Sequence, residues 1–92
     1  MRVVLTAAAL RDLEDIRSYA SIHFPSALPT LERRLYASIR RIGAWSESAP
    51  AVTGRLGVRM VPLVRYPFRI FDRIATDRVE LLHIHHAAPL AP

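Results

Sequence analysis

Two apolar runs separated by a short polar turn constrain the fold of this chain more than any other feature. Residues 66–74 and 78–84 are rich in aromatic and β-branched side chains, and residues 75–77 lie between them. Runs of this composition, joined by a short turn, predict an antiparallel β-hairpin. Strand side chains alternate between two faces, so every second residue of the first run should pack against the rest of the protein. These inward-facing residues are predicted to be Tyr66, Phe68, Ile70 and Ile74.

The opposite face of the first hairpin strand carries a row of arginines. Arg65, Arg69 and Arg73 are separated by even numbers of residues, so they should project from one face together with Phe71. A face that combines positive charge with an aromatic ring suits an acidic protein partner or a nucleic acid better than it suits water. We therefore expect this face to bind a partner.

Two amphipathic helices are predicted before the hairpin. The first covers residues 7–22 after an N-cap at Thr6, and the second follows a break at residues 24–26, with Ser26 as its cap. The first apolar stripe is Leu10, Leu13, Ile16 and Ala20. The second is Leu28, Leu31, Leu35, Ile39, Ile42 and Trp45. Because the joint is short, the two helices should form an antiparallel hairpin.

Two further strands complete the expected fold. They are predicted at residues 2–5 and 58–64, and Pro62 indicates that the latter bulges or lies at an edge. The predicted order is β-α-α-β-β-β, an α+β fold in which the helical hairpin packs on one face of an antiparallel sheet. We expect one domain over residues 1–92, with residues 87–92 forming a frayed tail.

Composition limits the chemistry available to the chain. Without cysteine, disulfides and thiolate metal sites are excluded. All 13 basic residues are arginine, which stays protonated, so acid–base chemistry would fall to histidine, carboxylate or tyrosine. No apolar run is long enough for a membrane span and no signal peptide is visible, so a cytoplasmic protein without membrane contact is expected. The high hydrophobic fraction, 51%, predicts apolar surface left over for a partner.

Three histidines close the second hairpin strand. His83 and His85 should share one strand face, and His86 should lie on the other. Two histidines at this spacing could ligate a metal ion, but no carboxylate or cysteine pattern completes a site. The sequence therefore predicts no metal and no cofactor. We expect these histidines to pack with the arginines or to bond to the backbone.

Several short motifs follow one another along the chain. They are the Leu-x-x-Leu-x-x-Ile-x-x-Tyr spacing of Leu10 to Tyr19, the Gly54-Arg55 loop, the strand of residues 65–71 and the closing His-Ile-His-His-Ala-Ala of residues 83–88. In these motifs and in the order of its elements, the chain resembles the ParE/RelE toxins of type II toxin–antitoxin modules. The resemblance covers nearly the whole chain. The residues of these motifs are closer to those of the ParE branch than to those of the RelE branch.

The resemblance implies a toxin of the bacterial stress response that inhibits DNA gyrase and is not an enzyme. It also implies a hetero-oligomer with a cognate ParD-like antitoxin, whose C-terminal segment folds onto the toxin. The partner-binding residues would be Leu10, Leu13, Tyr19, Arg65, Arg69, Phe71 and Arg73. The tail departs from the family, because residues 89–92 carry no charge where ParE-like chains often have further basic residues.

Two alternatives remain open at the level of the sequence. A RelE-like toxin would act on the ribosome and cleave messenger RNA, which requires a base, an acid and positive charge near the phosphate. The candidate residues for that chemistry are Arg59, Arg73, His83, His85 and His86. The other alternative is a non-toxic module that uses its sheet only to bind another protein.

Overall fold

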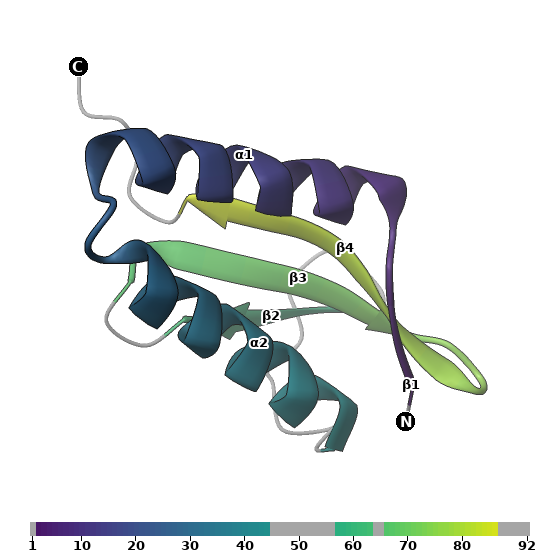
Figure 1. The fold of residues 1–92 in the computed structure, drawn as a ribbon. Coiled ribbons are helices and arrows are strands. Elements are labelled where there is room, and N and C mark those ends of the chain that lie inside the picture. Colours follow the sequence, from purple (N-terminus) through teal and green to yellow (C-terminus); the bar gives the residue numbers. More distant parts are fainter. Residues whose placement is uncertain (1, 45–56, 64–65, 87–92) are drawn as a thin grey trace.

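The order of secondary-structure elements is the one predicted from the sequence (Figure 1). A computed structural model describes residues 2–44, 57–63 and 66–86 of the chain. The elements are β1 (Arg2–Leu5), α1 (Ala7–His23), α2 (Leu28–Ala44), β2 (Val58–Pro62), β3 (Phe68–Ile74) and β4 (Arg78–His86). The predictions for Trp45, for the Gly54-Arg55 loop, for Arg65 and for the tail of residues 87–92 lie outside the described residues.

The four strands form one sheet in the order β1-β4-β3-β2. β2, β3 and β4 pair antiparallel, as the hairpin pattern predicts. β1 instead pairs parallel with β4, with Arg2 opposite Arg78 and Leu5 opposite Leu81. The α+β class is thus confirmed, but the prediction of a wholly antiparallel sheet is wrong for this pair. A parallel neighbour needs a long crossover, here both helices and two strands, and no local turn signal reveals it.

A β-bulge interrupts the pairing of the hairpin. Phe71 lies opposite His83, whereas the next residue, Asp72, lies opposite Leu81, so Leu82 is an extra residue in β4. A bulge of this kind shifts the alternation of side chains by one position. As a result Leu81 and Ile84, three positions apart, both point into the core.

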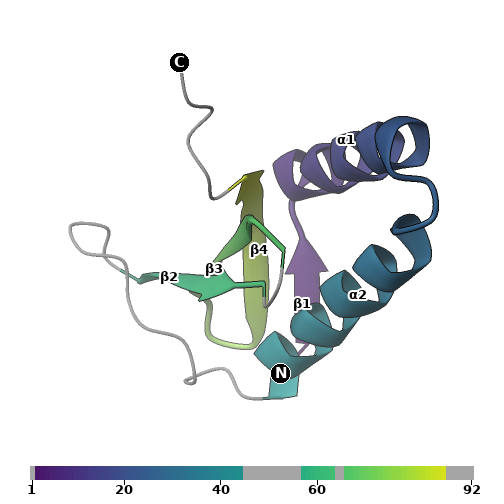
Figure 2. The ribbon, with the colours of Figure 1, turned by 90° about the vertical axis from the view of Figure 1, so that its left-hand side faces the viewer.

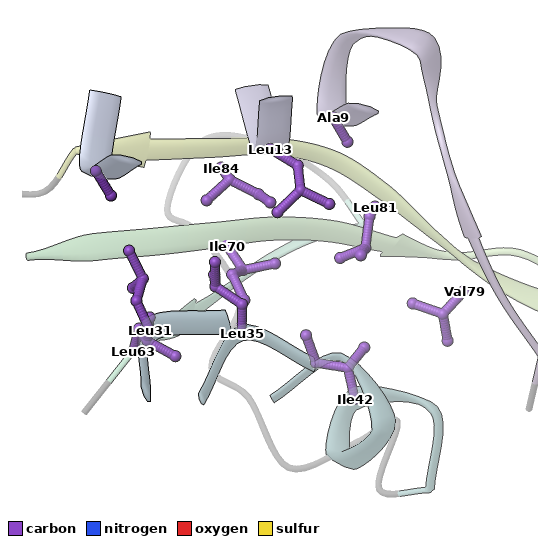
Figure 3. Packing of buried hydrophobic residues seen from close by; sticks show 11 residues of the cluster. Ala9, Leu13, Leu31, Leu35, Ile42, Leu63, Ile70, Val79, Leu81 and Ile84 are labelled. Atoms are coloured by element: carbon purple, nitrogen blue, oxygen red, sulfur yellow. The ribbon is translucent and has the colours of Figure 1, made fainter. Parts of the chain in front are cut away.

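Both helices cover the same face of the sheet (Figure 2). Figure 3 shows how side chains from the two helices meet those of β3 and β4. The buried cluster comprises Ala9, Leu13, Ala20, Leu31, Leu35, Ile42, Leu63, Ile70, Val79, Leu81 and Ile84. The inward face predicted for β3 is confirmed, because Ile70 is fully buried and the other three residues pack against this cluster.

The helix boundaries confirm one predicted cap and correct another. Thr6 caps α1 by accepting a hydrogen bond from the Ala9 N–H at 3.2 Å. α2 begins at Leu28, and its first hydrogen bond runs from the Leu31 N–H to the Ala27 carbonyl, so Ala27 holds the capping position predicted for Ser26. None of the helices in the described ranges has the length and apolar character needed to cross a bilayer.

Candidate functional site

The bulge in β4 determines where its histidines point. Simple alternation from the buried Val79 and Leu81 would carry His83 into the core. The extra residue instead places His83 and His85 on the outer face, where both are exposed. His86 lies on the other face, where its ring meets Phe68 edge-on at 5.4 Å between centroids. The predicted division of the three histidines between the faces is confirmed.

Asp12 of α1 covers the edge of β4 next to this bulge. The pairing with β1 ends at Leu81, so the outer backbone groups of β4 beyond it need other partners. Thr6 takes the first of them, because its backbone N–H and its hydroxyl both donate to the Leu81 carbonyl, at 3.1 and 2.8 Å. Asp12 Oδ2 then accepts a hydrogen bond from the Ile84 N–H at 3.0 Å.

The same carboxylate oxygen contacts a histidine ring. Asp12 Oδ2 lies 3.1 Å from His83 Nδ1, and the two residues are 71 positions apart in the sequence. The His83 and His85 rings lie 4.9 Å apart, and the His85 ring lies 5.4 Å from that of Phe71. Asp12, His83 and His85 thus bring one carboxylate and two imidazoles together, with donor atoms all within 4.8 Å of one another. Asp12 could not be identified as a site residue from the sequence, because its contact with β4 exists only in the folded chain.

The basic row on the outer face of the sheet is partly neutralised. Arg69 and Arg73 are exposed and share this face with Phe71, as predicted. Arg73 donates two hydrogen bonds to Glu80 Oε1 on β4, at 3.1 and 2.7 Å, and Arg78 donates one to Oε2 at 3.2 Å. The bonds from Arg73 and then from Arg78 hold the pKa of the Glu80 carboxyl below its ordinary value. Arg73 is therefore less available to a partner than its position in the sequence indicates.

Arg59 does not occupy a position from which it could hold a phosphate. Its guanidinium is buried and forms a two-pronged ion pair with Asp72, with N···O distances of 2.8 and 3.0 Å. Asp72 is fully buried, and only 9% of the Arg59 side chain is exposed. Its burial and its pairing with Asp72 argue against the role suggested for Arg59 in a ribonuclease. The Arg59 guanidinium and the Asp72 carboxylate are thus each other's partners inside the fold.

Exposed apolar residues gather at the end of α1. Tyr19, Ile22 and Phe24 are 58, 74 and 57% exposed, and we call these three residues the α1 patch. The Tyr19 and Phe24 rings lie 6.2 Å apart, and Tyr19 lies 4.2 Å from the His23 ring. Of these residues only Tyr19 was expected to contact a partner. Ile22 and Phe24 were missed because they lie beyond the apolar stripe of the helix.

The other two helical positions predicted to bind a partner differ from each other. Leu10 is 48% exposed, although the sequence pattern placed it on the buried stripe. Leu13 is only 7% exposed and belongs to the core, so it offers little surface for the predicted contact with a partner. The stripe that faces the sheet consists of Ala9, Leu13, Ile16 and Ala20.

Comparison with known proteins shows a likeness of fold. No protein-family model matches the chain, and no curated protein matches it significantly. A solved structure described as "Chromosomal ParDE TA system from P. aeruginosa" contains a chain that superposes with a TM-score of 0.82. The match covers 96% of this chain and 97% of the other, at 20% sequence identity. At this identity the comparison shows that the two chains share a fold.

Proposed function

We propose that this protein is the toxin component of a type II toxin–antitoxin module, acting in the cytoplasm on DNA gyrase and neutralised by a cognate antitoxin. The observation that carries the proposal is the shared fold with a chain of a ParDE system, which extends over almost all of both chains. The motifs that resemble ParE/RelE toxins point to the same function independently of the superposition.

The surface of the protein supports binding to an antitoxin. The α1 patch leaves three large apolar side chains in water, which is typical of a surface that a partner covers. The outer face of the sheet adds the exposed guanidinium of Arg69 beside Phe71. A segment with apolar anchors and acidic side chains would complement both features. This expectation fits a ParD-like antitoxin that folds onto the toxin when it binds.

One observation favours the alternative of a RelE-like ribonuclease. The contact between Asp12 and the exposed His83 is an arrangement that can orient an imidazole for proton transfer. The burial of Arg59 argues against this alternative, because it removes one of the cations expected to hold the phosphate. Gyrase inhibition needs no proton-transfer residue and therefore remains the preferred proposal.

Controlled expression in a bacterial host tests the proposal. We expect growth arrest with DNA breaks and intact messenger RNA, and recovery of growth when the antitoxin gene next to the toxin gene is co-expressed. Purified protein should inhibit gyrase in a DNA supercoiling assay. Codon-phased cuts in messenger RNA, with supercoiling unaffected, would instead identify a ribonuclease. Normal growth at confirmed expression of folded protein would indicate a non-toxic interaction module.

Histidine variants separate the two toxin mechanisms. For a gyrase inhibitor, His83→Ala and His85→Ala should change toxicity only as far as they change stability. For a ribonuclease, one of them should lower the cleavage rate by about 100-fold or more, the usual size of a general acid–base contribution. His23→Ala is the matched control, because His23 lies at the far end of α1 and takes no part in the Asp12 cluster.

A further inference from the structure

We propose that Asp12, His83 and His85 form a binding site for a divalent transition-metal ion of the zinc type. The site would join α1 to β4. It is independent of the proposed toxin function, because no step of gyrase inhibition or antitoxin binding is assigned to it.

The chemistry of the three side chains suits such an ion. Imidazole nitrogens and a carboxylate oxygen are the usual ligands of zinc when cysteine is absent, and three protein ligands leave a fourth position for water. Harder ions such as Mg²⁺ and Ca²⁺ prefer sites made of oxygen ligands alone. Two imidazoles beside one carboxylate therefore favour zinc and its neighbours among the transition metals.

The distances are close to those that a tetrahedral site requires. With metal–ligand bonds of about 2.0–2.1 Å, neighbouring ligand atoms lie roughly 3.3 Å apart. Asp12 Oδ2 and His83 Nδ1 lie 3.1 Å apart, and all three donor atoms lie within 4.8 Å of one another. His85 is exposed, so its ring has room to turn toward the other two donor atoms.

The backbone holds the site in place before any ion binds. The Ile84 N–H donates to Asp12 Oδ2 and fixes the carboxylate against β4. The bulge directs His83 and His85 to one side of the strand, where their rings lie 4.9 Å apart. Ligands that are already oriented lose little conformational freedom on binding, which favours affinity. The side chains of Asp12 and His83 are 26 and 47% exposed, so an ion can enter from solvent.

The surrounding charge sets a limit to the affinity. Arg69 pairs in register with His85 across β3 and β4, so its positive charge opposes that of the ion. Asp12 supplies the compensating negative charge within the cluster. We therefore expect binding that is weaker than that of a closed four-ligand structural zinc site but specific to this cluster.

Asp12 also has a structural role, and one substitution separates the two roles. In Asp12→Asn the amide oxygen can still accept the hydrogen bond from Ile84, but the neutral amide is a much poorer ligand for zinc. If the carboxylate only covers the strand edge, this variant should resemble the wild type in both stability and zinc binding. If the carboxylate is a ligand, stability should be retained while zinc affinity falls.

The test is calorimetric titration of the full chain, prepared without a histidine tag, with zinc chloride. We expect one ion per chain and a rise in melting temperature when zinc is added. His83→Ala, His85→Ala and Asp12→Asn should each weaken binding by at least about tenfold, since loss even of a residue that only supports a ligand has effects of that size. His23→Ala is the matched control and should bind zinc as the wild type does.

Spectroscopy on the wild-type protein keeps the test valid if a variant fails to fold. On addition of zinc, the side-chain resonances of His83 and His85 should shift in NMR spectra, while those of His23 should not. The proposal is overturned if no saturable binding occurs, or if the resonances of His83 and His85 stay in place. It is also overturned if folded variants at all three positions bind zinc as tightly as the wild type.

Discussion

At the scale of single residues, the charged side chains of the sheet fall into two environments. Arg59 and Asp72 pair in the interior, where neither can be hydrated. Glu80 pairs with Arg73 and Arg78 on the outer face, where both guanidiniums remain partly exposed to solvent. Because water screens the second group and not the first, substitutions of similar chemistry should have different consequences.

Removal of the buried carboxylate charge should destabilise the fold strongly. Asp72→Asn leaves the Arg59 guanidinium buried without its counter-charge, so we expect the free energy of unfolding to fall by about 3–5 kcal/mol in urea denaturation. Asp77→Asn is the matched control, since Asp77 pairs with Arg78 at 2.8 Å but its side chain is 65% exposed. Its effect should stay below about 1 kcal/mol. If the two substitutions lowered the free energy of unfolding equally, burial would not be what makes the ion pair of Arg59 and Asp72 important for stability.

Glu80 should make the stability of the protein depend on pH in the acid range. Its pKa is lowered in the folded state, so the ionised carboxylate stabilises the fold at pH values above its unfolded pKa. That stabilisation is lost as the pH falls through the folded pKa. The difference in unfolding free energy between wild type and Glu80→Gln should therefore be constant near neutrality and shrink below about pH 4.5. A difference that grows on acidification would contradict this assignment.

At the scale of elements, β4 shows what a sequence pattern can and cannot predict. Its apolar and β-branched run, with the polar turn before it, was sufficient to place the strand and its pairing with β3. The bulge at Leu82 was not predictable, because no glycine or proline accompanies it. That single extra residue places His83 outside the core and next to Asp12. The candidate site therefore depends on the β-bulge, which cannot be predicted from the spacing of apolar residues.

The exposed end of α1 should be needed for binding and not for folding. Tyr19→Ser combined with Ile22→Ser removes two exposed apolar side chains of the α1 patch, so the circular dichroism spectrum should be unchanged. Affinity for the proposed antitoxin should fall by at least about tenfold in calorimetric titration, because apolar and aromatic anchors dominate interfaces. Tyr36→Ser on α2, where Tyr36 is 40% exposed, is the control. If the double variant kept its affinity, the α1 patch would not be part of the interface.

At the scale of the whole molecule, short sequence patterns predicted the helices and strands. Contacts between residues far apart in the sequence determine how these elements are assembled. The helices, the hairpin and the inward face of β3 follow from periodicity over a few residues. The parallel pairing of β1 with β4 could not be predicted from the sequence, because four residues with no connecting turn do not specify a neighbour. The contact of Asp12 with His83 was not predictable for the same reason.

The pairing of β1 with β4 also determines when the protein can acquire its shape during synthesis. Arg2 to Leu5 find their strand partner only after residues 78–81 have been made, and the hydrogen bonds of Thr6 to β4 span 75 positions. Closing so long a segment costs chain entropy that is offset only once the last strand is in place. A ribosome that has made everything up to the end of β3 therefore still carries a chain in which β1 lacks its strand partner. Any ligand or partner that recognises the assembled sheet must wait for the final strand to emerge.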